Sequence, residues 1–224
     1  MPILINPAAP ELPTSLVEEA GSVDVPTLGH FLEEGFCDPA IARQVGRGRL
    51  VGRAVTVRIT ATDSTLVHKA TGLLQPGDVL VVDTGGDRIH APVGGVVANA
   101  VAAAGAVGVV IDGVCTDKTM LAETGLVVYA RGTSVLTTKL IGLDAGGINV
   151  PVSCGGVPVR PGALVLGDDN GVLIGDPTQV AGALGQARES DDSEPALLEK
   201  IRSGQKLSEL SAADALLAKL GHEA

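Results

Sequence analysis

Short apolar runs alternate along the chain with amphipathic stretches and glycine-rich turns. Three runs are almost purely apolar, as in strands buried on both faces: Val79 to Val82, Val107 to Ile111 and Leu126 to Ala130. Between the first two, Val93 to Ala104 is apolar nearly all round and predicts a helix packed on both sides. A shorter helix is expected before the third run. This order of strands and helices predicts parallel strands joined by helical crossovers.

The preceding segments carry weaker periodicities. Residues 14–45 predict a helical segment in which Phe31, Leu32 and Ile41 face inward. From Val51 to Thr60, apolar and polar side chains alternate, which predicts a strand with one exposed face.

Beyond Arg131 the pattern changes to short valine-rich pieces separated by glycine and proline. These pieces predict strands of an antiparallel or mixed layer: Ile148 to Val152, Val157 to Val159, Ala163 to Leu166 and Val172 to Ile174. Residues 178–222 return to leucines at helical spacing. We therefore expect one α/β domain over residues 1–224, with its core at about residues 51–177 and helical segments at both ends.

The charge balance argues against a nucleic-acid partner, and the lengths of the apolar runs argue against a membrane segment. The chain carries 26 acidic and 16 basic residues, a formal net charge of −10, and has no basic run. Because a nucleic-acid-binding surface needs a positive face, we expect no nucleic-acid partner. No apolar run reaches the roughly 20 residues that a membrane-spanning helix needs, so we expect no membrane segment.

The three cysteines are Cys37, Cys115 and Cys154, which are widely separated and form no CxxC pair. Their odd number and spacing argue against a disulfide framework or a zinc site and favour a reducing compartment. The first residues, MPILINPAAPELP, lack a basic stretch and are broken by prolines, so they predict no signal peptide. We expect a cytoplasmic protein.

Two glycines open the long apolar helix. Unpaired backbone N–H groups at a helix start can bind an anion, particularly where no β-carbon blocks the approach. The candidate donors for a ligand carboxylate are the residues Gly94, Gly95, Val96 and Val97. The alternative is that the glycines only allow the helix to pack closely on the sheet.

Asp117 follows the end of the second apolar run by a short loop, where ligands of α/β proteins commonly bind. A single carboxylate can hold Mg²⁺ or Mn²⁺, because these ions keep several waters and need few protein ligands. Asp117 is therefore the candidate metal ligand. The alternative role is the N-cap of the next helix, which the residues alone favour.

The loop after the first apolar run carries Asp83, Asp87, Arg88 and His90. Asp83 or Asp87 could carry a proton or bind a metal through water. Arg88 could pair with a substrate carboxylate, and His90 could relay a proton. The alternative is a solvated loop in which Asp83 pins the turn. The triplet DTG at Asp83 also matches aspartic proteases, but its single copy and the helix that follows argue against that class.

Two further residues have ordinary structural explanations. His68 lies on a predicted helix, where we expect a core or cap histidine rather than a ligand. Cys115 lies near Asp117, where we expect a small buried side chain rather than a reactive thiol.

Several segments together resemble the RraA-like family: LVGRAVTV, VHKA, QPGDVLVVDTGGD, GVVIDGVCTD and ARGTS, all within about Val51 to Pro177. This family contains 4-hydroxy-4-methyl-2-oxoglutarate aldolases, which also decarboxylate oxaloacetate, and a non-enzymatic regulator of ribonuclease E. The resemblance implies a three-layer β/β/α domain of the swivelling type. It also implies a homotrimer or homohexamer with sites at or near subunit edges.

Enzymes of this family carry a glycine, an arginine–aspartate pair after twenty further residues, and a carboxylate after two more. Counted from Gly95, the resemblance places Asp117 on the metal-binding aspartate. It places Gly94 to Val97 on the segment whose amides hold the pyruvyl group. Thr116 stands where the family has its substrate-contacting arginine, and Met120 stands where it has the final carboxylate.

Threonine offers one neutral hydroxyl where arginine offers a charged fork, so the resemblance implies weakened or altered aldolase activity, unless Arg88 or Lys118 compensates. We expect a Mg²⁺- or Mn²⁺-dependent lyase acting on a small 2-oxo acid such as 4-hydroxy-4-methyl-2-oxoglutarate or oxaloacetate. Its expected catalytic residues are Asp117, Arg88 and Asp83. Two alternatives stay open: a non-catalytic RraA-like regulatory binding protein, and a related metal-dependent hydratase or isomerase of a small acid.

Overall fold

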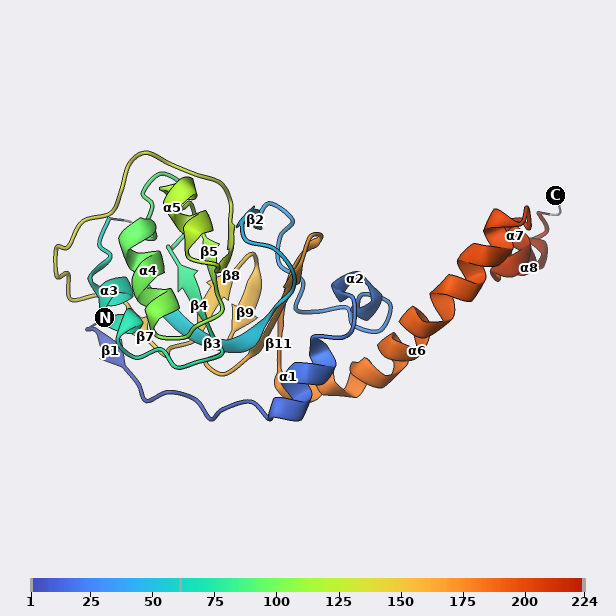
Figure 1. The fold of residues 1–224 in the computed structure, drawn as a ribbon, viewed down its shortest axis with the longest axis horizontal. Helices are drawn as coiled ribbons and strands as arrows, with labels where there is room; N and C mark the ends of the chain where they lie inside the picture. Colours follow the sequence, from blue (N-terminus) through green and yellow to red (C-terminus); the bar gives the residue numbers. More distant parts are fainter. Residues whose placement is uncertain (1, 61, 223–224) are drawn as a thin grey trace.

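The computed structural model describes residues 2–60 and 62–222, which form one mixed α/β domain with a projecting C-terminal arm (Figure 1). The strands are β1 (Leu4–Ile5), β2 (Ala42–Val45), β3 (Leu50–Arg58), β4 (Asp78–Asp83), β5 (Gly108–Asp112), β6 (Val127–Ala130), β7 (Gly147–Ile148), β8 (Val152–Cys154), β9 (Val157–Val159), β10 (Leu164–Asp168) and β11 (Gly171–Gly175). The helices are α1 (Thr14–Ala20), α2 (Val25–Leu28), α3 (Thr65–Thr71), α4 (Gly95–Ala103), α5 (Lys118–Glu123), α6 (Pro177–Arg202), α7 (Leu207–Leu210) and α8 (Ala213–Lys219).

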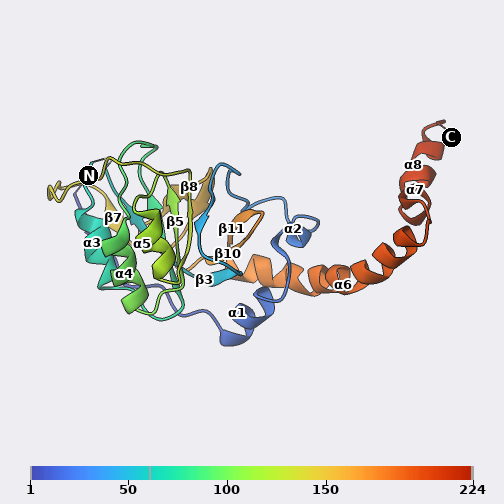
Figure 2. The same ribbon diagram turned by 45° about the horizontal axis from the view of Figure 1, so that its top comes forward.

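The parallel unit predicted from the three apolar runs is confirmed. The main sheet has the order β1-β7-β3-β4-β5-β6-β2, and β3 to β6 run parallel to one another. Helices α3, α4 and α5 cover one face of this sheet, and the β8–β9 hairpin lies on the other (Figures 1 and 2). β10 pairs antiparallel with β3 and β11, which gives the mixed layer expected beyond Arg131.

Alternate side chains of each central strand enter two different cores. On β4, Leu80 and Val82 pack beneath the helices, whereas Val79 and Val81 pack with the β8–β9 and β10–β11 hairpins. The sheet therefore has no solvent-facing side over these residues. This explains why the central strands are continuously apolar rather than alternating.

The chain's single tyrosine closes one end of the second core. Tyr129 of β6 is buried, and its hydroxyl donates to the Asp168 carbonyl at 2.7 Å and accepts from the Arg43 guanidinium at 2.9 Å. The ring lies against Gly167, where a β-carbon would come within 2.9 Å. Glycine at position 167 is therefore what allows β10 to approach β6 this closely.

The predicted exposed face of strand β3 is only partly right. Thr56 is fully buried, and its hydroxyl donates to the Val150 carbonyl at 2.6 Å. Arg53 is only 5% exposed and forms a two-pronged ion pair with buried Asp78, at 2.8 and 3.1 Å. The side chain of Arg58, at the end of the strand, is 44% exposed, so the alternation marked a surface there but not at Thr56.

The helical segment predicted for residues 14–45 is only partly right. Two short helices, α1 and α2, are followed by an irregular connection, and then β2 pairs antiparallel with β6. Phe31 is 39% exposed rather than facing inward, whereas Ile41 is buried outside any helix. Gly35 and Pro39 lie in this connection, and both are poor helix formers.

Helix α4 is packed on one side only, contrary to the prediction for Val93 to Ala104. Val97, Ala98 and Val101 face the core. Val96, in the first turn, is 75% exposed. The apolar side chains on the other side of α4, such as Val96, are therefore not buried by any other part of the chain that the structure describes.

The helical tail is confirmed, but most of it leaves the body of the domain. α6 begins at the N-cap Asp176, whose carboxylate accepts the Thr178 N–H at 2.9 Å, and it buries Val180, Leu184 and Ala187. Beyond these residues α6, α7 and α8 project as an arm (Figures 1 and 2). No helix among residues 2–60 and 62–222 combines the length and the apolar character needed to cross a bilayer.

A long connection without regular secondary structure links β6 to β7, and Asp63 holds its middle. The Asp63 carboxylate accepts the backbone N–H groups of Leu143 at 2.7 Å and Ile141 at 3.2 Å. It also accepts the N–H and the hydroxyl of Thr65, at 2.9 and 2.6 Å. Burial raises the pKa of this carboxyl, but these hydrogen bonds outweigh it and lower the pKa from 3.8 to about 2.

We therefore expect Asp63→Asn to remove a pH-dependent part of the stability. A lowered carboxyl pKa stabilises the fold above about pH 4, and that contribution is lost as the pH falls through about 2. The expected loss near neutral pH is roughly 2 kcal/mol in the free energy of unfolding. Urea unfolding of both proteins, at one protein concentration between pH 7 and pH 3, measures it.

The matched control is Asp169→Asn, because the Asp169 side chain is 89% exposed. We expect this change to shift the free energy of unfolding by no more than about 0.5 kcal/mol at any pH. A difference between wild type and Asp63→Asn that does not shrink below about pH 4 would contradict the assignment.

Candidate active site

A small hollow of about 150 Å³ lies where α3, α4 and the loop before α5 meet. It is lined by Ser64, His68, Ala91, Pro92, Gly94, Gly95, Val96, Val97, Thr116, Asp117, Thr137 and Thr138. The lining includes all the candidate ligand-binding residues at the start of α4, together with Thr116 and Asp117. The juxtaposition expected from strand ends and helix starts is therefore present.

The carboxylate of Asp117 rests directly on the start of α4. Its Oδ2 atom accepts the Gly95 N–H at 3.0 Å. A β-carbon on residue 94 would lie 2.6 Å from this oxygen and 2.7 Å from Thr116 Cγ2, so only glycine allows the approach. Asp117 itself adopts the left-handed conformation, with φ of 56°. It stands at the N-cap position of α5, but its side chain forms no hydrogen bond to that helix.

Two backbone donors in the first turn of α4 stay available. Ala98 N–H donates to the Gly94 carbonyl at 3.0 Å and Gly95 N–H to Asp117. Within the described part of the chain, Val96 N–H and Val97 N–H have no acceptor. Both residues line the hollow. A helix start with two unpaired N–H groups can hold a carboxylate.

Thr116 and Met120, which differ from the family pattern, both lie beside the start of α4. Thr116 lines the hollow, and its hydroxyl lies 3.4 Å from Asp117 Oδ1. Met120 packs over Gly95, where a β-carbon would come within 2.7 Å of its sulfur. The position of the family's final carboxylate thus holds an apolar side chain, 45% exposed, beside the helix start.

The sequence did not point to the opposite wall of the hollow. Ser64 and His68 of the α3 region line it, as do Thr137 and Thr138 of the long connection. His68 is exposed rather than in the core, which corrects the expectation for this residue. Its spacing of four from Ser64 places both on one helix face, a signal that could have been read from the sequence.

The carboxylates at the ends of β4 and β5 bind the β8–β9 hairpin. Asp83 accepts the Ser153 N–H at 3.1 Å and pairs with Arg58 at 3.3 Å. Asp112 accepts the Gly155 N–H at 2.8 Å and pairs with Arg131 at 2.5 Å. Asp83 is not among the residues that line the hollow, so its catalytic role stays a prediction.

The rest of the loop after β4 is held by its own side chains. Asp87 accepts from the backbone of His90 at 2.6 Å and contacts its ring Nδ1 at 3.0 Å. Burial raises the pKa of Asp87, but the hydrogen bonds from His90 and Ile89 outweigh it and lower the pKa. Arg88 is exposed and outside the lining of the hollow, and its charge helps to lower the pKa of Asp38. Its substrate-binding role also stays a prediction.

Cys115 behaves as the small buried side chain that we expected. It is fully buried, and its thiol donates to the Gly132 carbonyl at 3.6 Å. Burial raises its pKa, so the unreactive thiol form dominates near neutral pH.

The residues around Asp117 fit an ion that is held mainly through water and ligand. No cluster of three His, Cys, Asp or Glu side chains suited to a metal exists within residues 2–60 and 62–222. Asp117 Oδ2 is engaged by the Gly95 N–H, whereas Oδ1 has only the long Thr116 contact. One free carboxylate oxygen suits Mg²⁺ or Mn²⁺, which retain several waters, but does not suit a tight all-protein site.

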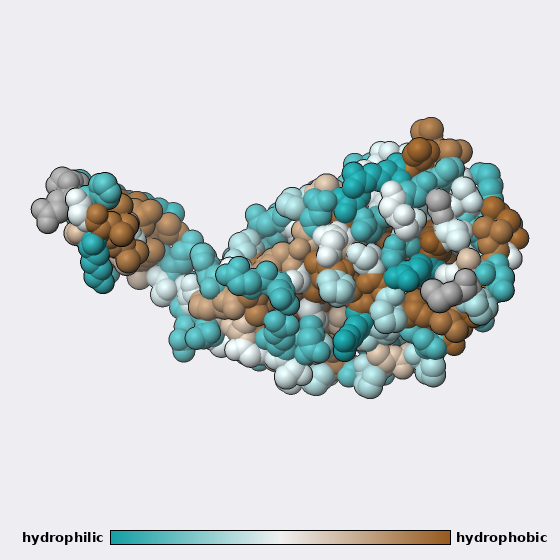
Figure 3. Space-filling view, turned by 180° about the vertical axis from the view of Figure 1, so that it is seen from behind, coloured by the Kyte–Doolittle hydropathy of each residue, from teal (hydrophilic) through white to brown (hydrophobic). Residues whose placement is uncertain are grey.

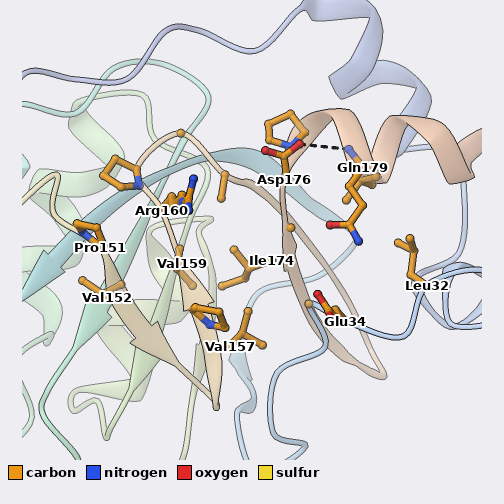
Figure 4. Close-up of a pocket in the computed structure, with 18 residues that line it drawn as sticks. Leu32, Glu34, Pro151, Val152, Val157, Val159, Arg160, Ile174, Asp176 and Gln179 are labelled. Carbon is orange, nitrogen blue, oxygen red and sulfur yellow. Dashed lines mark hydrogen bonds between the residues drawn. The ribbon is translucent and has the colours of Figure 1, made fainter.

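A larger cavity of about 540 Å³ lies on the other side of the domain (Figure 4). Prolines and valines of the β8–β9 hairpin form one wall, and the start of α6 with Leu32 and Glu34 forms the other. Figure 4 shows Arg160, Glu34 and Gln179 at separate points of its rim. Because these polar groups do not converge, we place the chemistry in the smaller hollow.

Known proteins resemble this chain in sequence. The RraA-like family, described as Aldolase/RraA, matches residues 22–174. A Halalkalibacterium halodurans protein is 40% identical over 126 residues, covering 56% of this chain and 59% of that protein. A Pseudomonas fluorescens Pf0-1 protein is 34% identical over 157 residues, covering 66% and 94%. Both carry the name "Putative 4-hydroxy-4-methyl-2-oxoglutarate aldolase".

Solved structures resemble it in fold. The RNA-processing inhibitor RraA from Thermus thermophilis has 29% identity and a TM-score of 0.63, covering 69% of this chain and 93% of that one. Streptomyces coelicolor RraAS2 has 23% identity and a TM-score of 0.73, covering 84% and 97%, which shows the fold alone. With most of the domain matched by one family, this chain belongs to the RraA-like family.

Proposed function

We propose that the protein is a divalent-metal-dependent lyase that cleaves a small 2-oxo acid in the hollow at the start of α4. The names of its relatives point to 4-hydroxy-4-methyl-2-oxoglutarate as substrate, and oxaloacetate shares the same 2-oxo acid group. One observation carries the proposal. Asp117 lines the same small hollow as Val96 and Val97, whose N–H groups have no acceptor within residues 2–60 and 62–222.

The charges in this space call for a cation. The N–H groups of Val96 and Val97 favour a carboxylate, yet Asp117 already places a negative charge beside them. Two like charges a few ångströms apart repel unless a positive charge lies between them. Among the described residues that line the hollow, only His68 can become positively charged, so a divalent ion on Asp117 is the simplest source of that charge.

Each group has a defined task in this proposal. The amides of Val96 and Val97 hold the substrate carboxylate and so orient the bond to be broken. Asp117, fixed by Gly95 N–H, holds the ion. When bound, the ion supplies Lewis-acid stabilisation of the negative charge that builds on the 2-oxo oxygen. His68 lies across the hollow and is the candidate to hold or move a proton.

The missing arginine lowers the expected rate. Thr116 supplies one neutral hydroxyl at the place where family enzymes supply a charged fork. The candidate replacements are Lys118, which directly follows Asp117 at the start of α5, and Lys139 of the long connection. The Lys139 Nζ lies 3.2 Å from the hydroxyl of Thr137, which lines the space.

We further propose that copies of the chain assemble as a homotrimer or homohexamer. Exposed apolar side chains surround the hollow on α4, α5 and the long connection: Val96, Met120, Val135, Leu136, Leu140 and Ile141. Apolar surface of this extent on a single chain is typical of a protein contact. A second subunit placed there would close the hollow and exclude water from it.

A regulatory binding protein is the second candidate. It is favoured by the loss of two chemical groups at Thr116 and Met120, and by the likeness to the RNA-processing inhibitor from Thermus thermophilis. The two candidates differ in one measurable respect, since only the lyase releases pyruvate from a 2-oxo acid.

The first test is turnover of oxaloacetate and 4-hydroxy-4-methyl-2-oxoglutarate with Mg²⁺ or Mn²⁺, followed as pyruvate release. We expect activity in the wild type and a fall of about 100-fold or more in kcat/KM for Asp117→Asn. Asp169→Asn, which removes an exposed carboxylate elsewhere, should retain full activity. An inactive wild type on both substrates would favour the regulatory protein.

The second test uses the close contact at the start of α4. Gly94→Ala places a methyl group within 2.6 Å of the Asp117 carboxylate and should displace it. We expect a fall in kcat/KM of about 10-fold or more with little change in overall fold. The matched control is Gly182→Ala, because nothing lies within 4 Å of that position on α6. Equal activities of the two variants would argue against the site.

The third test restores the missing group. Thr116 is partly exposed at the edge of the hollow, so an arginine there can reach the space. We expect Thr116→Arg to raise kcat by about 10²-fold, since loss of one such stabilising donor costs on the order of 10²–10³ in rate. Thr116→Lys, which keeps the charge without the fork, should gain less. A rate unchanged by arginine would show that another group already supplies this charge.

A further inference from the structure

Two of the three cysteines are neighbours in the fold. Cys37 belongs to the irregular connection after α2, and Cys154 is the last residue of β8. They are 117 positions apart in the chain, yet the Cys37 thiol donates to the Cys154 carbonyl at 3.5 Å. Both side chains belong to the same buried core, and both are free thiols in this structure. Neither residue lines the hollow at the start of α4.

Hydrogen bonds fix the backbone beside each cysteine. Cys37 N–H donates to the Val172 carbonyl at 2.9 Å, and the N–H of the next residue, Asp38, donates to the Gly155 carbonyl at 2.8 Å. Gly155 N–H in turn donates to the Asp112 carboxylate at 2.8 Å. Because the chain is already ordered on both sides, joining the two sulfur atoms costs little further conformational entropy.

The close approach of the two segments depends on a glycine. Gly155 directly follows Cys154 and has a φ of 58°. A β-carbon on residue 155 would lie 2.8 Å from the Cys37 β-carbon, so a larger residue there would push the connection away from the hairpin. A disulfide requires two β-carbons roughly 3.5–4.5 Å apart, and close backbones are its first condition.

The two thiols differ in accessibility. Cys37 is 8% exposed and is followed by three exposed residues, 38–40, whereas Cys154 is fully buried. The side-chain hydrogen bond with Cys37, burial and the negative charge of Asp112 all raise the pKa of Cys154, which keeps this thiol protonated near neutral pH. Figure 3 shows hydrophilic residues over much of the body of the domain, so a dissolved oxidant reaches this surface through water. Cys37 is the thiol of the pair that it meets first.

The third cysteine lies on the other side of the sheet. Cys115 packs in the core beneath α3, α4 and α5, whereas Cys37 and Cys154 pack in the core on the side of the β8–β9 hairpin. The Cys115 thiol donates to the Gly132 carbonyl at 3.6 Å. Cys115 is therefore a natural control, because it is a buried thiol away from the pair.

We propose that Cys37 and Cys154 form a site of reversible oxidation, at which hydrogen peroxide converts the two thiols into an intramolecular disulfide. The Cys37 thiolate attacks one peroxide oxygen, so that an S–O bond forms, the O–O bond breaks and hydroxide leaves. The Cys154 sulfur then attacks the Cys37 sulfur, so that the S–S bond forms, the S–O bond breaks and a second hydroxide leaves. The protons of the two thiols convert both hydroxides to water, and the two electrons lost by sulfur reduce the peroxide.

The disulfide ties the connection after α2 to the β8–β9 hairpin. It closes a loop between residues 117 positions apart, which restricts the unfolded chain and stabilises the folded one. We expect oxidation to raise the midpoint of thermal unfolding by roughly 5 °C or more. This inference is independent of the lyase proposal, since neither thiol lies in the hollow.

The test treats the 224-residue chain with hydrogen peroxide and counts the remaining thiols with a maleimide after denaturation. We expect the wild type to lose two of its three thiols and the mass of two hydrogen atoms, and dithiothreitol to reverse both changes. Peptide mapping should join Cys37 to Cys154 within one chain. Oxidation of Cys115 to the same extent, or oxygen added at Cys37 while Cys154 stays a free thiol, would overturn the proposal.

Three variants provide a second readout. We expect Cys115→Ala to form the disulfide and to gain thermal stability on oxidation as the wild type does. Cys37→Ala and Cys154→Ala should form no intramolecular disulfide and should show no rise in the unfolding midpoint. An unchanged or lower midpoint in the oxidised wild type would show that the bond forms only in a distorted domain, and would count against the site. The mapping of the wild type does not depend on how any variant folds.

Discussion

The approach of Asp117 to the first turn of α4 is the contact on which the site depends. The carboxylate occupies the space that a β-carbon of residue 94 would fill, and it takes one of the helix's free donors. This leaves two donors for a ligand and places a negative charge beside them. The proposed metal-dependent lyase reaction follows from that arrangement. The Asp117 carboxylate lies beside a helix turn that can bind a substrate carboxylate, so a cation is needed between the two negative charges.

The parallel sheet makes this approach possible, and its own carboxylates serve another purpose. Asp83 and Asp112 end neighbouring strands in register, and both accept backbone N–H groups of the β8–β9 hairpin. They join the third layer to the sheet. The loop after β5 then continues to Asp117, which is the first acidic side chain along it that turns toward the helices.

Much of the fold was predictable, because its main signal is local. Apolar runs such as Val79 to Val82 predicted buried strands, and the structure has a strand there. The glycines at 94 and 95 correctly predicted where α4 begins. The failures involve partners distant in sequence. Thr56 is buried because Val150 accepts its hydroxyl, and no pattern within β3 contains that residue. His68 lines the site together with Thr137 and Thr138 of the long connection, which Asp63 holds in place and which lies far from His68 in sequence.

The single buried tyrosine has an experimental consequence. The chain has no tryptophan, so Tyr129 is the dominant source of its intrinsic ultraviolet emission. Its hydroxyl joins β6 to the end of β10 and to Arg43 of the edge strand β2. Tyrosine emission therefore reports on the contact between β6 and β10. It does not report on structural changes in other parts of the molecule.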